Sequence, residues 1–263
     1  MRWVRFSESG AFKYGLLQGQ TIQEVSGDPF AGYQLLNKLY DFSAVKLEVP
    51  VVPRTFYCAG LNYAEHALEA ARKAGREANL PPKADIGYRA NNALIAHDEY
   101  VVIPPDAGEK VHYEGELVVV IGKRASHLTE ENALSCVLGY TIGNDVSERD
   151  WQRADRTLWR AKNSDTFKPM GPWIETDFEI EGARTIVRVN GRVTTEFKTA
   201  DMIFNCAKFI SEMTRYLTLW PGDVIWMGTD GASPNLNDGD LVEVEITGLG
   251  VLRNRFIRDK KNA

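Results

Sequence analysis

The stretch Tyr113-Glu-Gly-Glu-Leu-Val-Val-Val-Ile121 decides how the chain is expected to fold. Its second half, Leu117 to Ile121, is an unbroken aliphatic run rich in β-branched residues, which predicts a β-strand. Glu114 and Glu116 stand two apart at the head of this strand, so their side chains project from one face. The pair offers half of a chelate for a metal ion, although a lone Glu-x-Glu is also typical of a solvated strand end.

Asp145 supplies a third carboxylate. It closes the strand-like segment Gly139-Tyr-Thr-Ile-Gly-Asn144 and stands on a tight turn, where it can offer another oxygen ligand. Three carboxylates with no cysteine and no paired histidine select a hard cation over zinc or copper. A metal held by Glu114, Glu116 and Asp145 would therefore be Mg²⁺ or Mn²⁺, with Ca²⁺ as a further candidate, and the spacing by itself is only suggestive of such a site.

Around this centre the sequence is rich in strands. β-Branched or aromatic runs bounded by turn residues occur at Tyr100–Ile103, Glu116–Ile121, Gly139–Ile142, Thr185–Val189, Arg192–Phe197, Asp223–Met227 and Leu241–Ile246. Asn190-Gly191 predicts a two-residue hairpin, because both residues tolerate positive φ. Helical patterns interrupt the strands at Glu130–Val137, Glu148–Arg156 and Met202–Tyr216. We predict an α+β domain, mostly β, built on mixed or rolled sheets.

The first fifty residues form a separate pattern of short alternating runs. These are Trp3–Phe6, Tyr14–Leu17 and Thr21–Val25, separated by turn residues. The runs predict a small antiparallel meander. Prolines at positions 50 and 53 follow it, so we predict a small amino-terminal β domain over residues 1–50 and a larger domain over residues 51–263.

A candidate acid–base pair lies just after the predicted boundary. Asn62 can cap a helix that ends near Gly75, and His66 and Glu69 stand at i and i+3 on it. The glutamate can accept a hydrogen bond from one imidazole nitrogen and leave the other as a base. An ordinary surface pair has the same spacing. The polar, proline-bearing loop from Asn79 to Asn92 that follows is typical of a lid or of a disordered segment.

The segment after Asp145 is locally basic. A helix is predicted to begin at Ser147, and between Ser147 and Lys162 five cations stand against three acids in a chain whose net charge is −5. Cations of this kind can bind an anionic substrate, most specifically through a bidentate arginine on a carboxylate. A solvated amphipathic helix would have the same composition.

Composition excludes several classes of protein. With 263 residues, 44% of them apolar, the chain can bury a large core, and its longest aliphatic run is far too short to span a bilayer. The three scattered cysteines, Cys58, Cys136 and Cys206, argue against a disulfide framework and are expected to be buried free thiols. A sequence pI near 5.5 gives no basic footprint for nucleic acid. We expect a cytoplasmic protein whose partner is a small molecule rather than nucleic acid or a membrane.

Six motifs occur in a fixed order along the chain. They are Gly60-Leu-Asn-Tyr-Ala-Glu-His-Ala-Leu-Glu69, Tyr113-Glu-Gly-Glu-Leu-Val-Val-Val-Ile-Gly122, Gly139-Tyr-Thr-Ile-Gly-Asn-Asp-Val-Ser-Glu-Arg-Asp150, Lys162-Asn-Ser-Asp-Thr-Phe167, Gly171-Pro-Trp173 and Pro221-Gly-Asp-Val-Ile225. Together they resemble the fumarylacetoacetate hydrolase family, which includes acylpyruvases and 2-hydroxyhepta-2,4-diene-1,7-dioate isomerases. The resemblance covers roughly residues 55–254.

The resemblance implies a role for particular residues. It implies that Glu114, Glu116 and Asp145 ligate the metal, that His66 with Glu69 is the general base, and that Lys162 stabilises enolate charge. It further implies that Arg149, Gln152 and Thr229 bind the substrate. The family fold is a rolled mixed β structure, usually dimeric and often preceded by a small amino-terminal domain, so we expect a homodimer.

Two positions and one segment depart from the family pattern. Asp230 stands where a proline commonly follows Gly-Thr, and Met227 replaces a frequent threonine. Tyr88-Arg-Ala-Asn-Asn92 stands where many members have a Phe and a Lys ahead of a Pro-Ser pair. The substrate of a family member therefore does not transfer to this chain.

The resemblance favours a metal-dependent hydrolase that cleaves a carbon–carbon bond in a small acylpyruvate or 1,3-dioxo acid. One alternative is a decarboxylase or an enol–keto isomerase of a 2-oxo diacid in aromatic catabolism, which uses the same enolate without an attacking water. A lyase of a ureido acid is more distant. A non-catalytic domain stabilised by a structural ion belongs to a different class, and it would have no use for Lys162 or His66.

Overall fold

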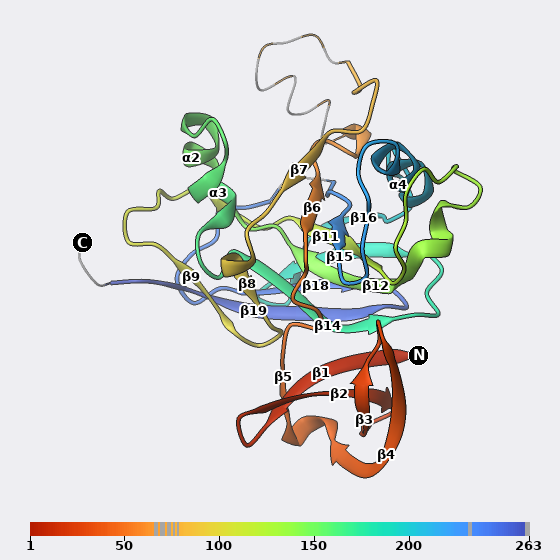
Figure 1. Ribbon diagram of the computed structural model, residues 1–263. Helices are drawn as coiled ribbons and strands as arrows, with labels where there is room; N and C mark the ends of the chain where they lie inside the picture. The colour runs from red at the N-terminus through yellow and green to blue at the C-terminus, as the bar shows by residue number, and fades with distance from the viewer. Residues whose placement is uncertain are drawn as a thin grey trace.

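The computed structural model describes residues 1–65, 68, 72, 75, 77, 79–230 and 233–260 and shows a mostly β protein with mixed sheets (Figure 1). The first strands are β1 (Arg2–Glu8), β2 (Ala11–Gln18), β3 (Thr21–Asp28), β4 (Gly32–Asp41) and β5 (Lys46–Leu47). They are followed by β6 (Phe56–Ala59), β7 (Ile86–Tyr88), β8 (Leu94–Ile95), β9 (Tyr100–Ile103), β10 (Val111–His112), β11 (Gly115–Ile121), β12 (Val137–Asn144) and β13 (Ser147–Glu148). The last strands are β14 (Lys168–Glu175), β15 (Arg184–Val189), β16 (Arg192–Lys198), β17 (Val224–Trp226), β18 (Leu241–Ile246) and β19 (Gly250–Arg258). The helices α2 (Arg149–Ala154), α3 (Trp159–Asn163) and α4 (Cys206–Thr214) and the 3₁₀ turns η1 (Phe42–Ala44), η2 (Asn91–Ala93) and η3 (Ala133–Cys136) complete the list.

The amino-terminal strands form the predicted antiparallel meander. Strands β1 to β4 pair in chain order, and β4 extends the three strands that the sequence suggested. Ser9 and Gly10 join β1 to β2 with φ values of 50° and 82°. Positive φ at both central residues is the geometry of a type I′ turn, whose twist matches that of the flanking strands.

One large sheet connects the meander to the rest of the protein. Its strand order is β4-β3-β2-β1-β14-β12-β11-β17-β6-β7. The pairing of β1 with β14 is narrow, because its register consists of Arg2 opposite Glu175 and Trp3 opposite Ile174. Figure 1 shows the meander projecting from the body of the protein near this junction.

A second sheet packs against the first. Its order is β16-β15-β18-β19-β9, with β9 parallel to β19 and the other pairs antiparallel. The predicted hairpin is present, since Asn190 and Gly191 have φ values of 52° and 78° between β15 and β16. The largest core includes Leu117 of β11 together with Val187 and Val244 of this second sheet.

Strand β11 is buried on both faces. Leu117, Val119 and Ile121 belong to the largest core, whereas Val118 and Val120 belong to a second core with Trp226 of β17. Burial on both faces explains why the run from Leu117 to Ile121 is apolar without alternation. Polar side chains are therefore confined to the end of the strand outside this run. The polar end is the one that begins at Glu114.

Some sequence expectations were wrong in detail. The helix predicted over Glu130–Val137 is only the 3₁₀ turn η3, and Val137 already begins β12. Helix α2 begins at Arg149 with Glu148 as its N-cap, because Ser147 is part of β13. The chain segment from 79 to 92 is not all loop, since its residues 86–88 form β7 and pair with β6.

The helix predicted after Asn62 is only partly described, and Ala64, Glu65, Leu68 and Arg72 are helical. The Asn62 side chain, which we expected to cap it, is buried and makes three hydrogen bonds. It accepts from the Phe204 N–H and donates to the carbonyls of Phe204 and Met227. All three cysteines are buried free thiols, as expected. Nowhere in the described part of the chain is there a helix with the length and apolarity needed to cross a membrane.

Candidate metal centre

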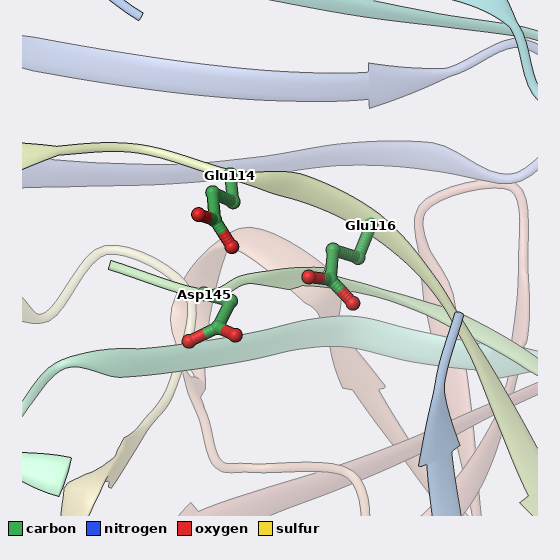
Figure 2. Close-up of side chains that lie close together, drawn as sticks. All are labelled: Glu114, Glu116 and Asp145. Atoms are coloured by element: carbon green, nitrogen blue, oxygen red, sulfur yellow. The ribbon is translucent and has the colours of Figure 1, made fainter. Parts of the chain in front are cut away.

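The three predicted carboxylates lie together at one end of the β11–β12 pair. Glu114 immediately precedes β11, Glu116 lies in it, and Asp145 immediately follows β12. The antiparallel register places Gly115 opposite Asn144, and the Asp145 N–H donates to the Glu114 carbonyl at 2.8 Å. One ligand oxygen from each carboxylate lies within 4.8 Å of the others, and Figure 2 shows the three groups converging.

The triad is buried and has the chemistry of a hard-cation site. Glu114, Glu116 and Asp145 are only 7%, 2% and 2% exposed. Burying three ionised carboxylates away from water costs free energy unless cations neutralise their charges. Carboxylate oxygens are also the ligands that divalent ions such as Mg²⁺, Mn²⁺ and Ca²⁺ prefer. The donor set therefore fits a divalent metal ion.

Two cations that the sequence singled out contact the triad. The Lys162 Nζ lies 2.6 Å from Glu114 Oε2 and 3.1 Å from Asp145 Oδ2, and Lys162 is itself buried. Arg149, the first residue of α2, places its Nη1 2.7 Å from Glu114 Oε1. Lys162 and Arg149 thus reach the same carboxylate from two helices.

Two further cations were not predicted. Arg89 follows β7, and its Nη2 lies 2.8 Å from Asp145 Oδ2. Lys168, the first residue of β14, is fully buried, with its Nζ 2.7 Å from Asp145 Oδ1. The Lys168 ammonium also donates to the carbonyls of Val146 and Phe167 at 3.0 and 2.8 Å. Both cations are directed at Asp145.

The surroundings shift the pKa values of two triad members in opposite directions. Burial raises the pKa of Asp145, but Arg89, Lys162 and Lys168 outweigh that effect and hold it well below its ordinary range. Burial, aided by the negative charges of Asp145 and Glu114, raises the pKa of Glu116 to about 8. These shifts favour an ionised Asp145 and, in the metal-free site, a protonated Glu116 near neutral pH.

Glu116 is held by the backbone of the next strand. The Gly228 N–H donates to Glu116 Oε2 at 2.8 Å, just beyond the end of β17.

Burial also lowers the pKa of Lys168 to about 8, although Asp145 opposes this shift. Because Lys168 forms an ion pair at 2.7 Å, we assign it the charged state beside an ionised Asp145.

A cavity of about 170 Å³ opens above the carboxylates. Its lining includes the triad, Lys162, Arg89, Gln152, Thr229, Leu158, Gly60, Leu61 and Asp85. Gln152 lies one helical turn after Arg149, so the two share a face of α2, and Gln152 Oε1 accepts a hydrogen bond from Arg149 Nη1 at 2.7 Å. The structure thus brings Lys162, Arg149, Gln152 and Thr229 to the triad. His66 and Glu69 lie outside the described residues.

Comparison with known families divides the chain into two matched parts. The model of the C-terminal domain of fumarylacetoacetate (FAA) hydrolase matches residues 55–257. A second model, described as Rv2993c-like, N-terminal, matches residues 1–50.

Individual relatives carry names from several reactions. An oxaloacetate tautomerase of Bacillus subtilis, YisK, is 30% identical over 95% of this chain and 90% of its own length. A 4-hydroxyphenylacetate degradation bifunctional isomerase/decarboxylase of Salmonella dublin is 38% identical over 77% of this chain and 47% of its own length. The crystal structure of a 5-carboxymethyl-2-hydroxymuconate delta-isomerase from Mycobacterium smegmatis superimposes with a TM-score of 0.89 and 32% identity, covering 98% of this chain and 100% of that one.

Proposed function

The chain belongs to the fumarylacetoacetate hydrolase family, and from this premise we propose that it is a divalent-metal-dependent enzyme that interconverts the enol and keto forms of a small anionic 2-oxo acid. The observation that carries the proposal is the charge pattern of the site. Three buried carboxylates converge within 4.8 Å, and four cations surround them at ion-pair distance. A divalent ion added to this set leaves a positive excess, which suits an anionic substrate and its enolate.

The residues have distinct tasks in this proposal. Glu114, Glu116 and Asp145 hold the ion, for which we propose Mg²⁺ or Mn²⁺. When bound, the ion supplies Lewis-acid polarisation of the 2-oxo group. Lys162 stabilises the negative charge that develops on the substrate oxygen, because a fixed ammonium in a dry site acts there without reorganisation.

The remaining polar groups orient the substrate. Arg149 and Gln152 come from one face of α2 and are hydrogen-bonded to each other, and Gln152 lines the cavity. In this proposal the pair binds a carboxylate and a neighbouring oxygen of the substrate. Thr229 follows Gly228, whose N–H bonds Glu116, so the Thr229 hydroxyl is tied to the geometry of the metal site. These three residues would fix the plane of the 2-oxo acid.

Carbon–carbon hydrolysis of an acylpyruvate, which the sequence favoured, is the second candidate. The spacing of His66 and Glu69 favours it, because that pair could activate water. The names of the three proteins described above support isomerisation instead, since each names a tautomerase or isomerase. Both reactions share the same metal-stabilised enolate.

The test follows the ultraviolet absorbance of the oxaloacetate enol with purified protein, in chelator and then in Mg²⁺ or Mn²⁺. We expect metal-dependent loss of the enol, and Lys162→Met should lower kcat by about 10²- to 10³-fold. Lys123→Met is the matched control, because Lys123 is exposed beyond the opposite end of β11.

The same samples are assayed for other products. Pyruvate and a carboxylic acid formed from an acylpyruvate, lost in chelator and in His66→Ala, would move the assignment to the hydrolase. Carbon dioxide from oxaloacetate would move it to a decarboxylase. Tight metal binding without any turnover would contradict all three reactions.

A further inference from the structure

The metal pocket contains a fourth carboxylate that the triad does not use. Asp85 lines the same cavity as Glu114, Glu116 and Asp145, but it is exposed, so it lies at the rim rather than on the floor. An exposed aspartate is ordinarily a solvated surface group. Its surroundings give this one a defined position.

The backbone of Asp85 is held from both sides. It directly precedes β7, whose Ile86 pairs with Ala59 of β6, and the Asp85 carbonyl accepts the Gly60 N–H at 2.8 Å. On the other side, the Ala84 N–H donates to Glu212 Oε2 of α4 at 3.1 Å. The segment therefore carries Asp85 to the pocket on anchored backbone.

Gly60 makes room for the carboxylate. A Cβ atom at position 60 would lie 2.6 Å from Asp85 Oδ2, closer than contact allows, and 3.1 Å from the Asp85 Cγ, a tight contact. Gly60 has no positive φ that would itself require glycine. Because Gly60 has no side chain, the space beside it at the pocket rim is free for the Asp85 carboxylate.

Asp85 also differs chemically from the other lining groups. The described residues of the pocket comprise the three triad acids, the cations Arg89 and Lys162, an amide, a hydroxyl and apolar or glycine positions. A carboxylate that ligates a metal is held in its deprotonated form and is therefore a poor proton acceptor for the substrate. Among these described residues, Asp85 is the carboxylate outside the triad, and its exposure allows proton exchange with water.

We propose that Asp85 is the group that moves the substrate proton. This inference rests on the enol–keto function proposed above. The Asp85 carboxylate takes the proton from C3, the C–H electron pair becomes the C2–C3 double bond, and the 2-oxo oxygen takes the negative charge. Transfer of the proton from Asp85 to that oxygen completes the enol and restores the carboxylate, so atoms and charge balance. His66, which the family resemblance implies as the general base, is the competing candidate for this step.

The test measures two rates with oxaloacetate and Mg²⁺: loss of the enol, and exchange of the C3 protons with D₂O followed by NMR. Asp85→Asn should lower both by about 10²-fold or more, because it keeps the shape and removes the base. Formate should restore part of the rate to Asp85→Ala but not to Asp85→Asn, in which no space is opened. Gly60→Ala should lower both rates by displacing the carboxylate without removing it.

Controls separate this role from folding and from metal binding. Mn²⁺ affinity, measured by electron paramagnetic resonance, should be unchanged in Asp85→Asn, and Asp106→Asn, an exposed acid outside the pocket, should keep full activity. Full exchange in Asp85→Ala together with lost exchange in His66→Ala would overturn the inference and leave the function intact. Absence of exchange and turnover in the wild type would overturn both.

Discussion

Two ionic networks in this protein have similar contact distances but different surroundings. The meander network consists of Glu8, Lys13, Glu24, Lys38 and Tyr40, with the Lys13 Nζ 2.8 Å from Glu8 Oε2 and 3.2 Å from Glu24 Oε2. The pocket network consists of the three triad acids with Arg89, Arg149, Lys162 and Lys168. Lys38 is 54% exposed, whereas Lys162 is 5% exposed.

The difference teaches that a contact distance alone does not say what an ion pair does. Water screens the exposed Lys38 of the meander network, so its pairs with Glu8 and Glu24 contribute little to stability, whereas Lys13 and Glu24 are 16% and 14% exposed and are screened less. In the pocket network the charges have lost their hydration, so each depends on its partners, and any new ion or substrate meets a strong field. Burying the charges of the pocket network costs free energy, and this cost is expected at a site that binds an ion or a substrate.

The largest difference between the networks should appear when Asp145 is removed. Asp145→Ala should lower the free energy of unfolding of the metal-free protein by about 3–5 kcal/mol, because the buried cations Arg89 and Lys168 lose their acidic partner. Urea unfolding in the presence of chelator measures this. Asp145→Asn, which keeps a polar acceptor, is the matched variant, and a loss below about 1 kcal/mol in Asp145→Ala would mean that water reaches the pocket network.

A pH titration should then sharpen the comparison. Because the pKa of Glu116 is raised to about 8, a proton competes with the metal below that pH and is displaced on binding. The apparent affinity for Mg²⁺ should therefore fall about tenfold per pH unit as the pH drops below about 8, and level off above it.

Calorimetry in buffers of different ionisation enthalpy should detect about one proton released per metal bound near neutral pH. Asp145 should not contribute, since its pKa lies well below this range. An affinity that is constant across this interval would show that Glu116 is already ionised without metal.

The smallest effect should come from the meander network. Lys38→Met removes a cation that lies 3.5 Å from Glu8 Oε2 and 3.7 Å from Glu24 Oε2 at an exposed position. The free energy of unfolding should change by less than about 1 kcal/mol, and still less in high salt. A loss comparable to that of Asp145→Ala would remove the distinction between the two networks.

The convergence of the three carboxylates could be anticipated from local sequence. Glu114 and Glu116 are spaced for one face of a strand, Asp145 ends the next strand, and adjacent antiparallel strands bring such ends together. Arg89 and Lys168 could not be anticipated in the same way. Arg89 meets a partner 56 residues away, and a lysine at a strand start is ordinarily exposed.

Two of the strands that the sequence analysis missed, β14 and β19, were missed for different physical reasons. Strand β14 contains Pro169, Gly171 and Pro172, which are typical of loops, so sequence patterns argue against it. Strand β19 did carry a signal, because its Leu252, Asn254 and Phe256 are buried and alternate with exposed Arg253 and Arg255.

The roles of His66 and Glu69 remain predictions.

The narrow pairing of β1 with β14 has a consequence for recombination between relatives. The two family models meet between residues 50 and 55, which suggests a convenient crossover point. The sheet nevertheless continues across that border, through Arg2 opposite Glu175 and Trp3 opposite Ile174. A chimera that takes its meander from a relative therefore also needs a β14 that pairs with the new β1. The unit that can be exchanged is larger than residues 1–50.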